Sequence, residues 1–402
     1  MRILHTSDWH LGRSFHRVDL LGAQAAYVDH LVDVVRSERV RAVVVAGDIY
    51  DRALPGVDAV SLCDEALARL ADAGANVIAI SGNHHSARRL GFGARLMARA
   101  GVHVRSDVHR AADPVLLTLD DGTPLAVYAV PYLEPDAVRP LLGADVGRGH
   151  EAVLTAMLAR CRADLAGRPG TRSVVIAHAF VRGGEPSESE RDISVGGISD
   201  VPLSVLAGFD YVALGHLHGR QRLAESVRYS GSPIAYSFSE RDHVKGSWIA
   251  DLSAAGLGHV AFVDAPVGRR LATVTGSLDE ILASPAYDAY ADHFLSVTLT
   301  DPGRVDDAMT RVQRRFPHAV HLEWQPVLSA GAVDASYRER IAGRDTVQIA
   351  AEFVEHARGT RPSAAESALL ADVVERERRS ADETPRLDVV ADGRADALAD
   401  IA

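Results

Sequence analysis

The chain has 402 residues, of which 47% are hydrophobic and 24% charged, and its formal net charge is −11 at pH 7. This length accommodates one large domain with one or two smaller units, and the composition excludes a fibrous or wholly disordered chain. No apolar run approaches the roughly 20 residues of a membrane helix, and the first ten residues read as a strand instead of a signal peptide. We therefore expect a cytoplasmic protein with no membrane partner, whose two cysteines, Cys63 and Cys161, are core residues in a reducing compartment.

The first part of the chain alternates short apolar strands with amphipathic helices. Strands are predicted at 2–6, 40–46 and 76–80, with helices at about 21–38, 57–73 and 90–99. Such β-α-β order predicts a parallel sheet with helices outside it. A hairpin over 114–131, a helix near 149–165, strands at 173–178 and 210–214, and strand-like runs at 227–230 and 246–251 follow, separated by a polar loop at 182–200. We predict two stacked sheets flanked by helices, ending near residue 255–265.

The remainder of the chain has a different character. Strand-like runs around a helix near 303–315 predict a small α+β unit over 266–335. Residues 345–376 predict an amphipathic helix pair, broken at Gly359-Thr360-Arg361-Pro362. Residues 377–402 are charged and poor in aromatics, which favours a disordered tail.

Metal-binding residue types follow five of the predicted strands. These are Asp8, His10, Asp48, Asn83, His178, His216 and His218. Because the carboxyl ends of parallel strands meet at one edge of a sheet, we expect these side chains to converge in a ligand crevice. Imidazole, amide and carboxylate donors suit Mn, Fe or Zn, and the lack of thiolates disfavours a structural zinc site. Seven donors exceed the needs of one ion, but two ions bridged by a carboxylate would use them all.

The motifs Asp8-x-His10, Gly47-Asp48-x-x-Asp51, Gly82-Asn83-His84, His178 and Gly215-His216-x-His218 match, in order, the signature of the calcineurin-like metallophosphoesterases. The flanking residues of the first motif, Met1 to Gly12, and the stretch Tyr229-Ser230-Gly231-Ser232-Pro233 resemble the SbcD branch of that family. The resemblance implies an α/β fold with a four-layer α/β/β/α sandwich over residues 1–260. It also implies a small α+β capping domain at 266–335 and C-terminal partner-docking helices at 345–376.

The resemblance also implies roles for individual residues. One metal ion would be held by Asp8, His10, Asp48 and His218, and the other by Asp48, Asn83, His178 and His216. Two divalent ions are implied, with Mn²⁺ favoured and Mg²⁺ or other ions as alternatives. His84 would act as a general acid or transition-state stabiliser, and Asp51 would orient it.

One residue departs from the family pattern, because His85 stands where an acidic residue usually follows Gly-Asn-His. Its loss could alter the pKa or tautomer of His84, or His85 could instead contact DNA phosphate; the sequence leaves both open. Basic residues that follow three of the motifs are further candidates for DNA contact. They are Arg13, His16, Arg17, Arg88, Arg89, Arg220 and Arg222.

Three functions compete at this stage. The resemblance implies a Mn-dependent DNA nuclease of an SbcCD-like complex, with 3′-5′ exonuclease and single-strand or hairpin endonuclease activity, acting as a homodimer with the ATPase SbcC. The alternatives are a phosphoesterase for cyclic nucleotides or small phosphodiesters and a non-catalytic organiser of the ATPase. The acidic net charge argues mildly against broad nucleic-acid affinity, although metal-binding carboxylates cease to repel DNA once metal is bound.

Overall fold

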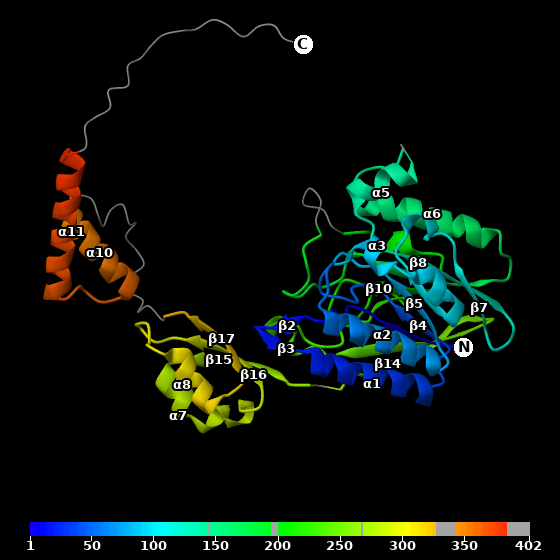
Figure 1. Ribbon diagram of the computed structural model, residues 1–402, viewed down its shortest axis with the longest axis horizontal. Helices are drawn as coiled ribbons and strands as arrows, with labels where there is room; N and C mark the ends of the chain where they lie inside the picture. The colour runs from blue at the N-terminus through cyan, green and yellow to red at the C-terminus, as the bar shows by residue number, and fades with distance from the viewer. Residues whose placement is uncertain (144, 194–199, 267, 327–342, 384–402) are drawn as a thin grey trace, which may run out of the picture. The chain divides into compact units, whose positions relative to one another are not determined.

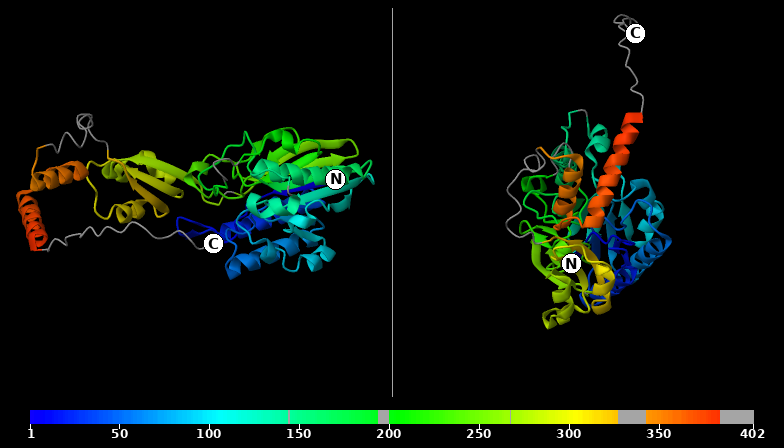
Figure 2. Two further views of the ribbon diagram at one scale, coloured as in Figure 1. Left: turned by 90° about the horizontal axis from the view of Figure 1, so that it is seen from above. Right: turned by 90° about the vertical axis from the view of Figure 1, so that its left-hand side faces the viewer.

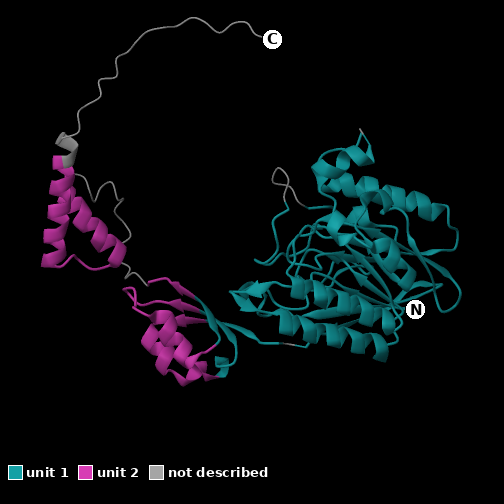
Figure 3. Cartoon of the chain, in the orientation of Figure 1, with its two compact units in different colours: residues 1–273, 289–296, 318–321 teal, residues 274–288, 297–317, 322–402 magenta. Residues whose placement is uncertain are grey.

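The computed structural model describes residues 1–143, 145–193, 200–266, 268–326 and 343–383. The chain forms two compact units, shown in Figure 3. The first contains residues 1–273 with 289–296 and 318–321, and the second contains 274–288, 297–317 and the described part of 322–402.

Two six-stranded sheets form the centre of the first unit (Figure 1). One has the order β14-β13-β1-β4-β5-β6, in which β1, β4, β5 and β6 are parallel. Its strands are β1 (Arg2–Thr6), β4 (Ala42–Val45), β5 (Asn76–Ile80), β6 (Val102–Arg105), β13 (Gly246–Ser253) and β14 (Gly256–Asp264). The other has the order β11-β12-β10-β9-β8-β7, in which β8, β9, β10 and β12 are parallel. Its strands are β7 (Val115–Thr118), β8 (Pro124–Val130), β9 (Arg172–His178), β10 (Tyr211–Gly215), β11 (Gln221–Arg222) and β12 (Val227–Tyr229).

Helices cover the outer face of each sheet, on opposite sides of the unit in Figure 2. On the first sheet lie α1 (Leu21–Ser37) and α2 (Val57–Asp72), followed by the short α3 (Ala87–Leu90) and α4 (Ala94–Met97), and on the second lie α5 (Pro135–Leu142) and α6 (His150–Ala166). Alternate residues of each central strand face different cores: Val43 and Val45 pack toward the helices, whereas Val44 packs between the sheets. Burial on both faces explains the continuous apolar runs of these strands. The predicted four-layer sandwich is confirmed.

Smaller elements complete the first unit. A two-residue-per-strand hairpin pairs β2 (Ser14–Phe15) with β3 (Val18–Asp19). Single turns of 3₁₀ helix lie at Ala98–Ala100, Val108–Arg110, Leu203–Leu206 and Phe238–Glu240. Cys63 and Cys161 are buried free thiols in the two outer cores. Within the described residues, no helix is long and apolar enough to cross a membrane.

A three-stranded sheet, β15-β16-β17, follows the sandwich, and its residues are divided between the two units. The elements of this region are β15 (Leu271–Gly276), α7 (Leu278–Ala283), a 3₁₀ helix at Pro285–Tyr290, β16 (Phe294–Leu299), α8 (Ala308–Arg315) and β17 (Ala319–Trp324). The second unit continues with α10 (Thr346–Arg358) and α11 (Ala364–Glu383), which contact each other. The helix pair breaks where the sequence indicated, but α11 continues seven residues into the segment expected to be a tail. Residues 384–402 of that expected tail lie outside the described residues.

Candidate metal centre

The carboxyl ends of the parallel strands of both sheets meet at one place. Three contacts join the two sheets there. The Nε2 atoms of His10 and His218 are 3.1 Å apart, Nε2 of His178 lies 3.4 Å from Oδ2 of Asp48, and the main-chain N–H of His216 donates to the Asp8 carboxylate at 3.1 Å. The donors therefore converge from β1, β4, β9 and β10, as the strand-end pattern predicted.

The backbone that presents these donors is strained. Asp8, His10, Asp48 and His216 all have positive φ values, of 53°, 45°, 42° and 105°. Non-glycine residues avoid this region, and each such residue costs of order 1–3 kcal/mol, so the surroundings must enforce it. Main-chain hydrogen bonds provide part of that constraint, because the N–H groups of Asp8 and His10 donate to the carbonyls of Gly47 and Asp48 at 3.1 and 2.9 Å. The loops after β1 and β4 are thereby fixed to each other.

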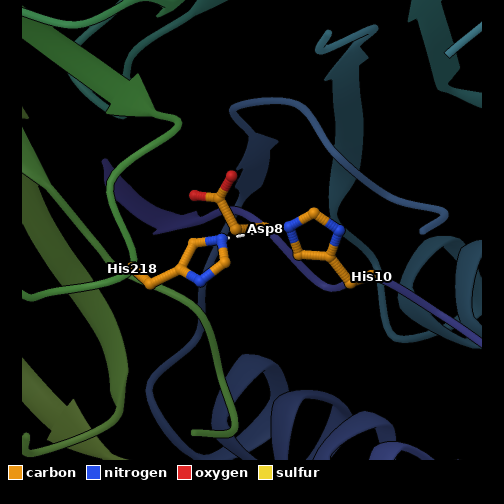
Figure 4. Close-up of side chains that lie close together, drawn as sticks. All are labelled: Asp8, His10 and His218. Carbon is orange, nitrogen blue, oxygen red and sulfur yellow. Dashed lines mark hydrogen bonds between the residues drawn. The ribbon is translucent and has the colours of Figure 1, made fainter. Parts of the chain in front are cut away.

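Asp8, His10 and His218 form a first group of donors, with ligand atoms within 4.8 Å of one another. Figure 4 shows the two imidazoles facing each other beside the Asp8 carboxylate. The Ser189 hydroxyl donates to Glu240, so it accepts from Nδ1–H of His218. This leaves the Nε2 lone pair of His218 directed at His10. Two nitrogens 3.1 Å apart have about the separation of adjacent ligands on one ion with bonds of about 2.1 Å.

Asp48, His178 and Asn83 form a second group. His178 donates from Nδ1 to the Ala46 carbonyl at 2.9 Å, which fixes its tautomer. Its Nε2 atom then faces Oδ1 of Asn83 at 2.8 Å and Oδ2 of Asp48 at 3.4 Å. The ring of His216 packs edge-on against His178, with centroids 5.3 Å apart. Once Nε2 of His178 has lost its proton, this nitrogen and the two oxygens beside it are a suitable donor set for a cation.

The space around Asp48 and His178 excludes any side chain larger than glycine at two positions. A Cβ on Gly82 would lie 2.2 Å from Oδ1 of Asp48, and one on Gly47 would lie 2.2 Å from Nδ1 of His178. Gly47 also has a φ of +99°, which side-chain-bearing residues rarely adopt. The glycines in the Gly-Asp and Gly-Asn-His motifs thus allow the backbone to approach the donors closely.

The protonation of the buried donors also fits a site for cations. Burial raises the pKa of Asp8 to about 6, although His178 and His218 act against it. Burial would lower the pKa of His178, but the Asp48 and Asp8 carboxylates outweigh it and raise this pKa to about 9. Burial lowers the pKa of His10 well below its usual value, and Nδ1 of His10 has no hydrogen-bond partner among the described residues. The buried carboxylates favour positive charge nearby, and in the metal-free protein bound protons supply that charge. Divalent cations can take the place of these protons, so the donor set fits them.

His84 lies beside both groups. Its main-chain N–H donates to Oδ1 of Asp48 at 3.1 Å, and its Nε2 atom is 3.9 Å from Oδ2 of the same carboxylate. Nδ1–H of His84 donates to the main-chain carbonyl of Asp51 at 2.7 Å. The orienting group is therefore the carbonyl of Asp51 and not its carboxylate, which instead faces Nδ1 of His10 at 3.7 Å and Nε of Arg13 at 3.8 Å.

His85 is enclosed by main-chain amides. The N–H of Tyr50 points at Nε2 at 2.9 Å, and the N–H of Gly82 points at Nδ1 at 3.0 Å. Burial lowers the pKa of His85 to about 4, so the ring is neutral at pH 7 and has one acceptor nitrogen for two donors. Neither ring nitrogen is left free for a DNA phosphate.

A buried network that the motifs did not indicate supports His218. Glu240, which is 1% exposed, receives a hydrogen bond from Ser189 and is paired with Lys245 at 2.5 Å. Lys245 also donates to the His218 carbonyl at 2.8 Å, and the His218 N–H donates to Glu190 at 2.7 Å. Charge-assisted hydrogen bonds of this kind orient a ligand imidazole. The sequence offered only a Ser- and Glu-rich loop as a sign of this network.

Comparison with known proteins identifies the group to which this centre belongs. The family model of calcineurin-like phosphoesterases matches residues 1–220, more than half of the chain. The chain belongs to this family. A second model, SbcD_C, described as the type 5 capsule protein repressor C-terminal domain, matches residues 267–358. The chain is therefore a metallophosphoesterase with the SbcD-type combination of domains, as its motifs predicted.

Solved structures similar to this phosphoesterase cover about two thirds of it. They include the protein TT1561 of Thermus thermophilus (15% identity, 65% of this chain and 98% of that chain, TM-score 0.37). A dimetal phosphatase from Danio rerio has 17% identity over 66% of this chain and 99% of that chain, with a TM-score of 0.36. The calcineurin-like phosphoesterase YfkN from Bacillus subtilis has 10% identity over 66% and 90%, with a TM-score of 0.37.

The basic residues considered for DNA contact differ in how accessible they are in this phosphoesterase. Arg13 is largely enclosed, over the Tyr236 ring, and Arg220 lies 4.4 Å from the Phe262 ring centroid. Arg222 is paired with Glu225. Arg17, Arg88 and Arg89 are exposed, and His16 packs against Phe15 and His321. Their contact with DNA stays a prediction.

Proposed function

We propose that this metallophosphoesterase is a Mn²⁺-dependent DNA nuclease, the catalytic subunit of an SbcCD-like complex that acts in DNA repair and recombination. The observation that supports it best is the coincidence of a two-group donor site with an SbcD-type C-terminal domain on one chain. A small phosphoester substrate requires neither the α+β region after residue 266 nor the α10–α11 pair. The proposal includes 3′-5′ exonuclease and single-strand or hairpin endonuclease activity.

Asp8, His10, Asp48 and His218 would hold one ion, and Asp48, Asn83, His178 and His216 the other. Bound ions would neutralise phosphate charge and lower the pKa of a water nucleophile. Asp48 suits the shared position because its Oδ2 atom lies within 4 Å of His10, His84 and His178 at once.

His84 is the residue placed to move a proton. The Asp51 carbonyl holds the proton on Nδ1, so Nε2 faces the Asp48 carboxylate and the reaction centre. In its protonated form, Nε2–H can donate to the leaving oxygen of a phosphodiester. Burial of the centre keeps bulk water from competing with these interactions.

The test compares cleavage of hairpin and linear duplex DNA with hydrolysis of bis-p-nitrophenyl phosphate, with and without Mn²⁺ and an SbcC-type ATPase. A DNA nuclease should cut DNA in the presence of Mn²⁺, and Asp48→Ala should abolish cleavage. Hydrolysis of the small ester without DNA cleavage would favour a small phosphodiester as substrate. An Asp48→Ala variant as active as the wild type would exclude this centre as the catalyst.

A further inference from the structure

Five arginines outside the metal centre line two adjoining cavities of about 630 and 580 Å³ beside the edge strand β6. We call this region the arginine pocket. It is formed by Arg88 of α3, Arg95 of α4, Arg99 of the following 3₁₀ turn, Arg105 of β6 and Arg110. Among the described residues, Asp107 is the one carboxylate that lines either cavity, in a chain of net charge −11. The concentration of positive charge therefore runs against the composition of the whole chain.

The charges of the arginine pocket are not neutralised within the described parts of the chain. The side chains of Arg88, Arg95 and Arg99 make no hydrogen bond or ion pair with any described residue. Nε of Arg105 is buried and lacks a hydrogen-bond partner among those residues. Arg110 has only a 3.6 Å approach to Asp113, and both side chains are more than half exposed. Exposed ion pairs of this kind contribute little to stability, so the Arg110 charge is hardly offset by Asp113.

Like charges held together destabilise a fold unless an anion offsets them. Arg95 and Arg99 lie four positions apart in a helical stretch, a spacing at which like charges repel. Burial and the neighbouring Arg110 charge lower the pKa of Arg105, which shows the same repulsion. Guanidinium groups present planar pairs of donors that match phosphate oxygens.

The arginine pocket is connected to the metal centre along the chain. Helix α3, which carries Arg88, begins three residues after His84, and the Ser106 hydroxyl donates to the Ala87 carbonyl at 2.7 Å. The end of β6 is thereby tied to the start of α3. In the part of the chain that the structure describes, no aromatic ring other than that of a histidine lines either cavity, so neither offers a stacking surface for a nucleobase. A series of backbone phosphates fits this arrangement better than a free nucleotide.

We propose that the arginine pocket binds the phosphodiester backbone of duplex DNA, at a stretch beyond the phosphate held in the metal centre. This inference rests on the proposed function. It assigns Arg95, Arg99 and Arg105 to substrate positioning, away from the bond that is cut. Such contacts raise affinity for long duplexes and carry no sequence information.

The test uses the full chain with Arg95, Arg99 and Arg105 all changed to Gln. The matched control removes three exposed arginines, one in the last turn of α1 and two just after this helix, in the variant R36Q/R39Q/R41Q. Binding of a labelled duplex is followed by fluorescence anisotropy without divalent metal, over about 50–200 mM salt. Each lost phosphate contact reduces the slope of log K against log salt by about 0.9, so the pocket variant should lose about 2–3 in slope and bind roughly 10- to 100-fold more weakly. The control should change little.

Separate outcomes distinguish the pocket from the proposed function. Mn²⁺-dependent hydrolysis of bis-p-nitrophenyl phosphate should stay within about twofold in the pocket variant, since that ester is too small to span both sites. If the wild type binds duplex with a steep salt slope and the pocket variant matches it, the pocket inference is overturned. If the wild type hydrolyses the ester but neither binds nor cuts DNA, the proposed function itself fails. If light scattering shows that the pocket variant has a different oligomeric mass from the wild type, the inference is overturned, because the arginines would then act in self-association.

Discussion

Replacing His85 with Asp should stabilise the metal-loaded protein and leave its catalytic turnover nearly unchanged. Two main-chain N–H groups, of Tyr50 and Gly82, point at the two ring nitrogens at 2.9 and 3.0 Å, and a neutral imidazole can accept from only one. A carboxylate has two oxygens that can both accept. The acidic residue that is usual at this position in the family can therefore accept hydrogen bonds from both N–H groups, whereas His85 can accept from only one of them.

The size of the effect follows from the unpaired donor. A buried N–H without a partner costs about 1–3 kcal/mol. Against this gain stand the desolvation of the new carboxylate and its repulsion from Asp48, whose charge already acts on His85. Bound cations offset the repulsion. We therefore expect a gain of about 1–2 kcal/mol in the free energy of unfolding with Mn²⁺ and about zero without it.

Urea titration with and without Mn²⁺ measures this difference, and His259→Asp, at an exposed position of β14, controls for the added charge. Turnover of bis-p-nitrophenyl phosphate should change by less than about threefold, because the Asp51 carbonyl sets the tautomer of His84. A His85→Asp protein that is less stable than the wild type with Mn²⁺, or an equal gain from His259→Asp, would refute the reasoning. A large loss of turnover would show that residue 85 acts through His84.

Three further outcomes follow from the structure. Glu240→Gln should weaken Mn²⁺ binding about 10- to 100-fold by calorimetry, because the carboxylate fixes an imidazole of the first group through Ser189. Gly82→Ala should lower Mn²⁺ affinity at least tenfold, as its Cβ would collide with the Asp48 carboxylate, whereas Gly56→Ala, which meets nothing within 4 Å, should not. Burial lowers the pKa of His5 to about 3, so between pH 6.5 and 3 the unfolded chain binds more protons than the folded one, and stability falls on acidification. Urea titrations at pH 7 and pH 5 should therefore show a loss in the free energy of unfolding of the wild type. This loss should be smaller in His5→Gln by about 1 kcal/mol per pH unit.

The positions of the candidate metal-binding residues could be predicted because strand ends obey a simple rule. Apolar runs such as Val43–Val45 have to be buried on both faces, and the polar residues after them then lie at the carboxyl edge. The sequence also placed His84 next to the ligands. It could not reveal that four of these residues have positive φ, since contacts between distant loops, among them the hydrogen bonds between the loops after β1 and β4, enforce that geometry.

What the sequence missed depends on contacts between distant loops. Ser189, Glu240 and Lys245 come from separate segments, and no spacing rule joins them. The sequence indicated that Asp51 orients His84, but it could not show that the contact is made by the main-chain carbonyl of Asp51, because every residue type has that group. The length of α11 was underestimated because charged residues read as tail, although ion pairs such as Arg376 with Asp372 lie at the spacing that supports a helix.

The geometry and charge of the centre are best understood together. Asp8 and Asp48 lie almost completely buried among imidazoles, in a strained backbone that costs stability. Without cations, the neighbouring carboxylates raise the pKa of His178 to about 9, so its Nε2 atom carries a proton at neutral pH. Nε2 cannot bind a metal ion while it holds this proton. Metal binding therefore has to displace a proton from His178. The fold maintains a site that is unfavourable when empty of positive charge, and divalent cations are the charges that its oxygen and nitrogen donors can satisfy together.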